Sequence, residues 1–168
     1  MSPVPESFRA FRIHADAKPY RSGIEIITPD QLSPGELWIK VAYSSVNYKD
    51  ALAGTGKGKI LREPELNGGI DVAGHVLQSS DPGFREGDAV LITGSGLSET
   101  RDGGYSEYLR IPARVTIPLP SGLDLRESMI LGTAGFTAGL ALMRMEANGQ
   151  SPEMGPIVVT GATGGVGM

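Results

Sequence analysis

The stretch IVVTGATGGVG, residues 157–167 of the 168-residue sequence, decides the fold class that we predict. Its β-branched run is typical of a buried strand, and the glycines at 161, 164 and 167 indicate a tight turn into a helix. Glycine lets backbone N–H groups close on a pyrophosphate, which the dipole of a following helix also favours. The stretch therefore predicts the dinucleotide-binding loop of an α/β domain.

The glycine spacing departs from the usual G-x-G-x-x-G pattern of such loops. When Gly164 and Gly167 take the last two glycine positions, Ala162 takes the first and Gly161 lies one residue early. A flexible glycine-rich tail is the alternative interpretation, but the preceding strand-like run favours the binding loop. The acidic residue that contacts the cofactor ribose follows about 20 residues later in such domains. It would lie beyond Met168, so the loop itself does not distinguish NAD from NADP.

The composition excludes several classes of function. Hydrophobic residues make up 40% of the sequence and charged residues 20%, as in ordinary globular proteins, while 24 glycines and 12 prolines indicate many turns. The net charge of −4 provides no basic surface for nucleic acid. There are no cysteines, and His14 and His75 are the two histidines, which excludes disulfides, thiolate chemistry and the usual Cys/His zinc site. We therefore expect no metal.

The sequence also bears on localisation. Prolines and a glutamate occupy residues 3–6, where a signal peptide has a basic and then an apolar region. The most apolar segment, Met129 to Met143, is interrupted by glycines and threonines and is too short to span a bilayer. We expect it to form a buried helix. These features predict a cytoplasmic protein that binds neither membranes nor nucleic acid.

Apolar residues alternate with polar ones along much of the chain, which predicts short strands separated by glycine turns. Several such strands favour a barrel-like all-β unit. The clearest one begins at Glu36 and ends at Ser45, with Leu37 and Ile39 on one face and Trp38 on the other. The predicted strands cover residues 8–13, 23–27, 36–45, 68–77, 87–93, 105–111 and 115–120.

Polar residues gather where the clearest strand ends. Asn47 could cap a short helix over 47–53, but capping does not account for the neighbouring Tyr48. Strand-to-helix corners often carry functional side chains on a rigid support, so a site and a solvated cap both remain open. Asp71 lies between apolar neighbours, where a carboxylate needs hydrogen-bond donors. We interpret His75, in the same strand, as an ordinary sheet histidine.

The character of the sequence changes after Ser121-Gly122. Asp124 and Glu127 form a capping-box pattern, and an apolar helix follows as far as about Ala147. Each glycine inside it costs about 1 kcal/mol of helix stability, which suggests close approach of another helix or of a ligand. Thr133 could offer its hydroxyl to that ligand, although a hydrogen bond within the helix is the simpler explanation.

Taken in order, these segments resemble the medium-chain dehydrogenase/reductase superfamily, in its zinc-independent, quinone-oxidoreductase-like part. The acrylyl-CoA reductase group is the nearest look-alike. The resemblance implies a mostly β fold: a chaperonin-10-like (GroES-like) barrel at 1–124, then, at 125–168, the first helix, strand and phosphate loop of an incomplete α/β Rossmann domain. The matching segments are SSVNYKDAL (44–52), GTGKGK (54–59), GIDVAG (69–74), GGYSE (103–107), ILGTAGFTA (130–138) and VVTGATGGVG (158–167).

The resemblance implies an enzyme that passes hydride from NADPH to an activated carbon–carbon double bond, here acrylyl-CoA to propionyl-CoA. Zinc-dependent relatives have a histidine–glutamate pair where this sequence has Ile70-Asp71, in agreement with the missing cysteines. Tyr48 could donate a proton or only hold the nicotinamide, and no catalytic residue is assigned. The implied cofactor contacts are Asn47, Tyr48 and Thr133 at the nicotinamide, and Thr163, Gly164, Gly165 and Val166 at the pyrophosphate.

Two departures and two alternatives accompany this resemblance. Gly68-Gly69 replaces a usual proline–glycine pair, and Met168 stands where relatives have a small residue and could crowd the cofactor. The alternatives are an NADPH-dependent quinone reductase and a non-catalytic β-barrel binding module. We expect a homodimer when full length and an inactive 168-residue chain. One strand cannot make a Rossmann sheet, so we expect residues 125–168 to be poorly supported or to pair with another chain.

Overall fold

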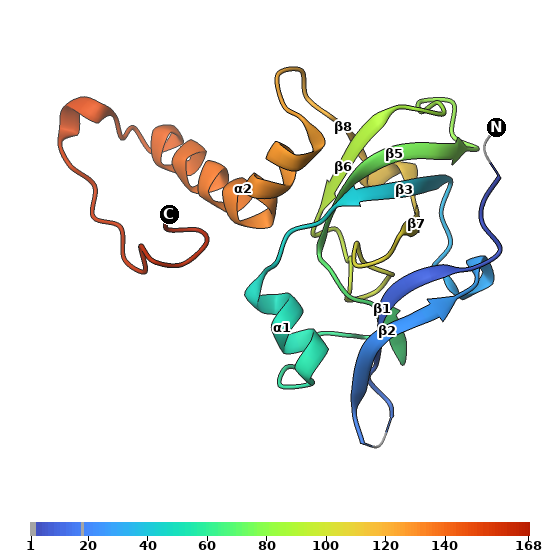
Figure 1. The fold of residues 1–168 in the computed structure, drawn as a ribbon. Coiled ribbons are helices and arrows are strands. Elements are labelled where there is room, and N and C mark those ends of the chain that lie inside the picture. The colour runs from blue at the N-terminus through green and yellow to red at the C-terminus, as the bar shows by residue number, and fades with distance from the viewer. Residues whose placement is uncertain (1–2, 18) are drawn as a thin grey trace.

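Two antiparallel sheets form a barrel-like body, and a long helix leads away from it (Figure 1). The computed structural model describes residues 3–17 and 19–168. The smaller sheet has the strand order β2-β1-β4, and β1 pairs with β2 from Phe8 opposite Ile27 to His14 opposite Arg21. The strands predicted at 8–13 and 23–27 are confirmed, whereas the sequence analysis missed β4. The bounds are β1 (Phe8–His14), β2 (Arg21–Ile27) and β4 (Glu65–Asn67).

The larger sheet has the strand order β7-β3-β5-β6-β8. All five of its strands were predicted, four of them with bounds a few residues too long, because alternation continues into the adjoining turns. The prediction at 68–77 began before β5 and ended before its last residue, Ser79. The mostly β, GroES-like fold class is confirmed. The bounds are β3 (Leu37–Tyr43), β5 (Asp71–Ser79), β6 (Ala89–Thr93), β7 (Tyr108–Ile111) and β8 (Ile117–Pro118).

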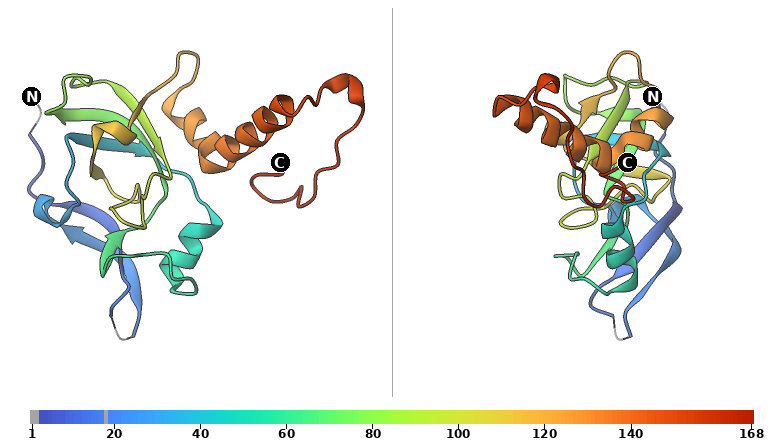
Figure 2. Two further views of the ribbon diagram at one scale, coloured as in Figure 1. Left: turned by 180° about the vertical axis from the view of Figure 1, so that it is seen from behind. Right: turned by 90° about the vertical axis from the view of Figure 1, so that its left-hand side faces the viewer.

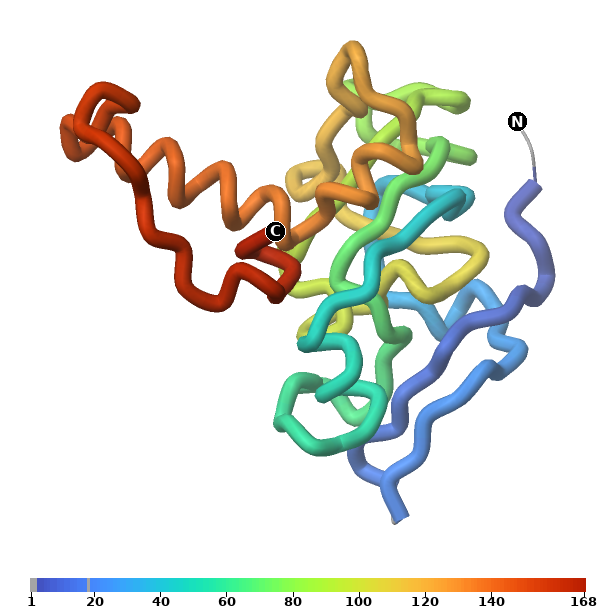
Figure 3. The backbone as a smooth tube through the Cα atoms, turned by 60° about the vertical axis from the view of Figure 1, so that its left-hand side comes forward, coloured from blue at the N-terminus to red at the C-terminus, as the bar shows by residue number. Residues whose placement is uncertain are grey.

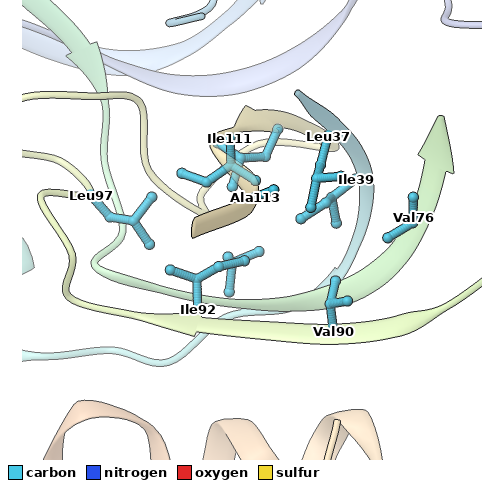
Figure 4. Close-up of a cluster of buried hydrophobic side chains, with 10 residues drawn as sticks. Leu37, Ile39, Val76, Val90, Ile92, Leu97, Ile111 and Ala113 are labelled. Atoms are coloured by element: carbon cyan, nitrogen blue, oxygen red, sulfur yellow. The ribbon is translucent and has the colours of Figure 1, made fainter. Parts of the chain in front are cut away.

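The main core lies inside the larger sheet, where aliphatic side chains from several strands meet (Figure 4). Leu37 and Ile39 of β3 are both fully buried, as the alternation predicts, and they face Val76 of β5. Burying each such side chain contributes roughly 1.5–3 kcal/mol. The cluster comprises Leu37, Ile39, Val72, Val76, Val90, Ile92, Leu97, Leu109, Ile111 and Ala113.

A buried ion pair ties the smaller sheet to the loop before β7. Arg12 of β1 donates from Nη1 to Asp102 Oδ1 at 2.7 Å and to Asn67 Oδ1 at 3.0 Å. Asp102 also accepts the Asn67 N–H at 2.8 Å and both the N–H and hydroxyl of Ser33, at 2.6 and 2.8 Å. Each oxygen of the Asp102 carboxylate therefore has two donors.

The helices connect and extend the sheets. The helix α1 (Tyr48–Thr55) follows β3, and α2 (Leu125–Ala147) follows the barrel. The predicted capping box opens α2, because Asp124 Oδ1 accepts the Glu127 N–H at 2.7 Å and Glu127 Oε2 accepts the Asp124 N–H at 2.9 Å. Short 3-10 turns lie at η1 (Pro29–Gln31), η2 (Ala113–Val115) and η3 (Pro152–Met154).

The expectation that the apolar segment 129–143 is a buried helix is wrong for most of its length. Only the first turns of α2 contact β3, β5 and β6, so Ser128, Met129 and Gly132 are buried while Phe136 is 57% exposed. The helix bends at Gly132, and its second part runs away from the barrel (Figure 2). By length and composition α2 could cross a membrane, a test that core helices of water-soluble proteins also pass.

The predicted strand at 157–160 does not form in the described part of the chain. Val158 is 88% exposed and the segment has no regular structure. A strand needs a neighbour for its N–H and C=O groups, and no described strand lies beside this segment. The tail instead returns toward α2 (Figure 3), where a Cβ added at Gly165 would lie 3.5 Å from the Cβ of Ala134.

We predict that Asp102→Asn lowers the free energy of unfolding by about 3 kcal/mol, because an amide NH₂ would face donors that now point at a carboxylate. Urea unfolding of the chain measures this loss. The control is Arg9→Ala, which breaks the exposed 2.7 Å ion pair with Glu107 and should change the stability little. Equal losses in the two variants would contradict the role given to the buried pair.

Candidate functional site

The carboxylate of Asp71 is the centre of a polar cluster between the barrel and α2. Asp71 begins β5 and its side chain is fully buried. Its Oδ2 accepts from Asn47 Nδ2 at 2.8 Å and from the Thr133 N–H at 3.1 Å, and its Oδ1 accepts the Thr133 hydroxyl at 2.6 Å. The donors that a buried carboxylate requires thus come from two segments far apart in sequence.

Asn47 reaches Asp71 because it lies at the corner between β3 and α1. It is the N-cap residue of α1, with extended φ and ψ of −119° and 155°, as the sequence predicted. Its backbone N–H donates to Asp50 Oδ2 at 2.8 Å, so the carboxylate three residues later closes the first turn. The corner is therefore rigid, and the carboxamide of Asn47 points to Asp71.

Thr133 reaches Asp71 because α2 breaks at the residue before it. Gly132 has φ of 49° and ψ of −155°, a conformation open almost only to glycine. A Cβ at Gly132 would lie 2.4 Å from Ser45 Oγ and 3.0 Å from Asp71 Oδ2. A close approach thus occurs at Gly132, but it is to Ser45 and to Asp71 of β5, not to another helix or a ligand as the sequence analysis suggested.

Two serines tie the same corner to β5 and to α2. The Ser44 hydroxyl donates to the backbone oxygen of Asp71 at 2.6 Å, and the Ser45 hydroxyl donates to the backbone oxygen of Met129 at 2.6 Å. The helix carbonyl at Met129 loses its regular partner near the break at Gly132, and Ser45 supplies one. The sequence analysis quoted this segment but missed both roles.

A second buried carboxylate, Asp50, accepts hydrogen bonds from residues at the same corner. Besides the Asn47 N–H, it accepts the Ile70 N–H at 3.0 Å and the Tyr105 hydroxyl at 3.1 Å. Tyr105 also donates to the backbone oxygen of Ser45 at 2.9 Å. Burial raises the pKa of Tyr105, and the negative charges of Asp50 and Asp71 raise it further, so this hydroxyl holds its proton and acts as a donor.

The remaining predicted contact residues lie near the cluster or in the tail. Tyr48 is the first residue of α1 and is 80% exposed, with no hydrogen bond among the described residues. The loop with Thr163, Gly164, Gly165 and Val166 forms successive turns, in which Gly164 N–H donates to Gly161 O at 2.9 Å. Within the described chain the N–H groups of Thr163, Gly165 and Val166 donate to no protein atom.

A cleft of about 590 Å³ lies between β6 and the first half of α2, and Thr133 is on its wall. Its large apolar lining residues are Leu91, Ile117, Leu123, Leu131 and Phe136. Such a mainly apolar cleft with a few polar groups is the usual form of a site for a small molecule. No group of three or more metal-ligating side chains occurs among residues 3–17 and 19–168.

One domain family and several named oxidoreductases are similar to this chain. The alcohol dehydrogenase GroES-like domain family matches residues 33–121. YhfP of Bacillus subtilis, which carries the name of a quinone oxidoreductase, is 49% identical over 160 residues, or 95% of this chain and 48% of YhfP. The acrylyl-CoA reductase AcuI of Ruegeria pomeroyi is 45% identical over 148 residues, or 88% of this chain and 44% of AcuI.

Solved structures agree with these relatives. The YhdH oxidoreductase of Salmonella enterica in complex with NADP superposes with a TM-score of 0.90 at 45% identity, over 95% of this chain and 49% of YhdH. YhfP of Bacillus subtilis with NAD bound gives 0.90 at 47% identity, over 97% of this chain and 50% of that one. The chain spans about half the length of the relatives that it matches.

We predict that Gly132→Ala lowers the free energy of unfolding by about 2 kcal/mol or more, because the new Cβ clashes and the backbone becomes strained. Gly139→Ala, in the same helix, is the matched control, since a Cβ there meets nothing within 4 Å. It should instead raise stability by up to about 1 kcal/mol. Urea unfolding of both variants measures these changes. A gain in stability for Gly132→Ala would contradict the conclusion that the helix break requires glycine.

We also predict that Tyr105 contributes to the loss of stability at alkaline pH. Its folded pKa is raised, so stability is fully present below the unfolded tyrosine pKa of about 10 and is lost as pH rises toward the folded pKa. In Tyr105→Phe, this part of the loss should disappear, and unfolding above about pH 10 should release one proton fewer. Urea unfolding against pH tests it; identical slopes for both proteins above pH 10 would contradict it.

Proposed function

Because the chain belongs to the alcohol dehydrogenase GroES-like domain family, within the zinc-independent medium-chain dehydrogenase/reductase superfamily, we propose that it contributes the substrate-side domain of an NADPH-dependent reductase. Its reaction is hydride transfer to an activated carbon–carbon double bond, with acrylyl-CoA as substrate and propionyl-CoA as product. In this proposal residues 1–124 form the GroES-like barrel, and residues 125–168 begin the Rossmann domain.

The observation that carries the proposal is the convergence of Asn47 and Thr133 on Asp71 at the foot of α2. Their hydrogen bonds to a buried carboxylate hold both side chains in fixed positions, and Thr133 lies on the wall of an apolar cleft. Fixed polar groups at the edge of an apolar cleft orient a ligand with little loss of side-chain entropy on binding. Tyr48, exposed on the adjoining turn of α1, completes the group that we assign to the nicotinamide.

The glycine loop fits a pyrophosphate by the donors that it offers. Thr163, Gly165 and Val166 have N–H groups with no partner in the described chain, as an anion-binding loop requires. A Cβ at Gly167 would lie 2.5 Å from the oxygen of Gly161, so only glycine fits this turn. We assign the pyrophosphate to Thr163, Gly164, Gly165 and Val166. The tail approaches α2 at Ala134, next to Thr133.

NADPH supplies the hydride when it is bound, and the NADP complex of the relative YhdH supports this choice of cofactor. Addition to an acrylyl thioester develops negative charge on the thioester oxygen, which a hydrogen-bond donor must stabilise. The phenol of Tyr48 is the exposed donor of the cluster. We assign it to the bound nicotinamide or substrate and name no proton donor for the α-carbon.

A quinone reductase is the second candidate, and the name carried by YhfP, at 49% identity, favours it. Reduction of a quinone uses the same hydride and the same donor residues but needs no recognition of a coenzyme A thioester. A non-catalytic β-barrel binding module, the third candidate, predicts no NADPH binding at all. We further propose a cytoplasmic homodimer for the complete gene product.

We predict that the complete gene product oxidises NADPH with acrylyl-CoA at a kcat/KM at least about tenfold above that with 1,4-benzoquinone, a difference of about 1.4 kcal/mol in transition-state binding. Absorbance at 340 nm measures both rates. The reverse preference would establish the quinone reductase. NADPH binding without turnover of either substrate would contradict both reductases, and absence of NADPH binding would leave the binding module.

The role of Tyr48 is tested by the pair Tyr48→Phe and Tyr48→Ala. If the ring holds the nicotinamide, Tyr48→Ala should raise the KM for NADPH about tenfold while Tyr48→Phe leaves it unchanged. If the hydroxyl stabilises the developing charge, both variants should instead lower kcat. Ile26→Ala, which alters a side chain 75% exposed on β2, is the control and should change neither constant. No change in either Tyr48 variant would remove Tyr48 from the site.

A further inference from the structure

We propose that Asp71 is a positioning residue that fixes the hydrogen-bonding polarity of Thr133 at the nicotinamide site. It accepts from both donors of Thr133, so this residue offers only its hydroxyl oxygen to a ligand, and the site selects a nicotinamide by the NH₂ of its carboxamide. This inference rests on the proposed function and deepens it. It assigns to Asp71 a task that the barrel alone does not require.

The orientation of Asn47 follows from the chemistry of its partner. A carboxylate only accepts hydrogen bonds, so the side-chain group of Asn47 that faces Asp71 at 2.8 Å must be the NH₂. The amide oxygen Oδ1 therefore points away from Asp71, toward the Asp50 N–H in the capping box that opens α1. Asp71 thus fixes the orientation of Asn47, and the acceptor that this inference assigns to the ligand comes from Thr133.

The same reasoning fixes Thr133. Its single hydroxyl hydrogen is used at 2.6 Å on Asp71 Oδ1, and its backbone N–H is used at 3.1 Å on Oδ2. A threonine hydroxyl has one donor and two acceptor lone pairs, so toward the cleft it can only accept. This acceptor on the cleft wall matches an N–H bond of a primary carboxamide and accepts no hydrogen bond from a group that lacks one.

Asp71 differs from the structural carboxylate of the barrel in its partners. Asp102 is paired with the Arg12 guanidinium at 2.7 Å, whereas Asp71 makes no ion pair with any cation of the described chain. A buried carboxylate without a cation costs stability, and an apolar residue of similar size would avoid this cost. The break at Gly132 adds backbone strain so that Thr133 can reach Asp71. Two destabilising features that serve one contact indicate a functional role.

The test compares NADPH with its reduced 3-acetylpyridine analogue, in which a methyl group replaces the carboxamide NH₂. Isothermal titration calorimetry of the complete gene product should give a Kd about tenfold lower for NADPH than for the analogue, the effect of about one hydrogen bond. In Asp71→Asn the new NH₂ would donate to Thr133, whose hydroxyl would then turn its hydrogen outward. The ratio of the two Kd values should fall to about one.

Matched variants separate this effect from loss of structure. Thr133→Val should lower the Kd ratio as Asp71→Asn does, whereas Thr133→Ser should keep the wild-type ratio because it keeps the hydroxyl. Asp102→Asn alters the other buried carboxylate, so it should lower the unfolding midpoint of the cofactor-free protein without changing the ratio. If Asp71→Asn does not fold, the two threonine variants carry the same test.

The outcomes distinguish this inference from the function on which it rests. A wild-type protein that binds neither NADPH nor the analogue overturns both. A wild-type protein that binds the two cofactors equally, or folded Asp71→Asn and Thr133→Val variants that keep the wild-type ratio, overturn the inference and leave the reductase intact. If the ratio of the two Kd values falls equally in Asp102→Asn, the role of Asp71 is only structural.

Discussion

The burial of the Asp71 carboxylate without a neighbouring cation constrains the structure around it. Neutral donors must converge on its two oxygens, and they come from Asn47 on one side and from Thr133 on the other. This requirement fixes where β3 turns into α1 and where α2 meets the barrel. It also explains the glycine at 132, because a Cβ on the broken backbone there would lie 2.4 Å from Ser45 Oγ. The helix α2 loses its regular geometry at this point so that the buried Asp71 carboxylate receives its hydrogen bonds.

The features that the sequence predicted are those with a local cause. Alternation of apolar residues predicted β1 and β2, and the Asp124 capping box predicted the start of α2. The short strand β4 was missed because three residues carry no readable period. The partners of Asp71 could not be predicted, although its need for donors could. Pattern shows that a buried acid needs partners, but only the fold shows which distant segments supply them.

The segment 157–160 and the later part of α2 show the limit of propensity. A β-branched run favours a strand only when another strand accepts and donates its hydrogen bonds, and none does so in the described chain. The helix needs no such neighbour, because its hydrogen bonds are internal, so α2 forms although Phe136 and Met143 are more than half exposed. Without a packing partner, therefore, the strand at 157–160 does not form, whereas the helix α2 does.

The two buried carboxylates of this corner show why burial alone does not identify function. Asp50 accepts from two backbone N–H groups and from Tyr105, so its contacts complete a turn and expose no new polar atom. Asp71 accepts from the side chains of Asn47 and Thr133, and the Thr133 hydroxyl on the cleft wall keeps oxygen lone pairs that the protein does not use. The two carboxylates therefore differ in what their partners retain for a ligand, because an acceptor left on a cleft wall can determine which ligand binds there.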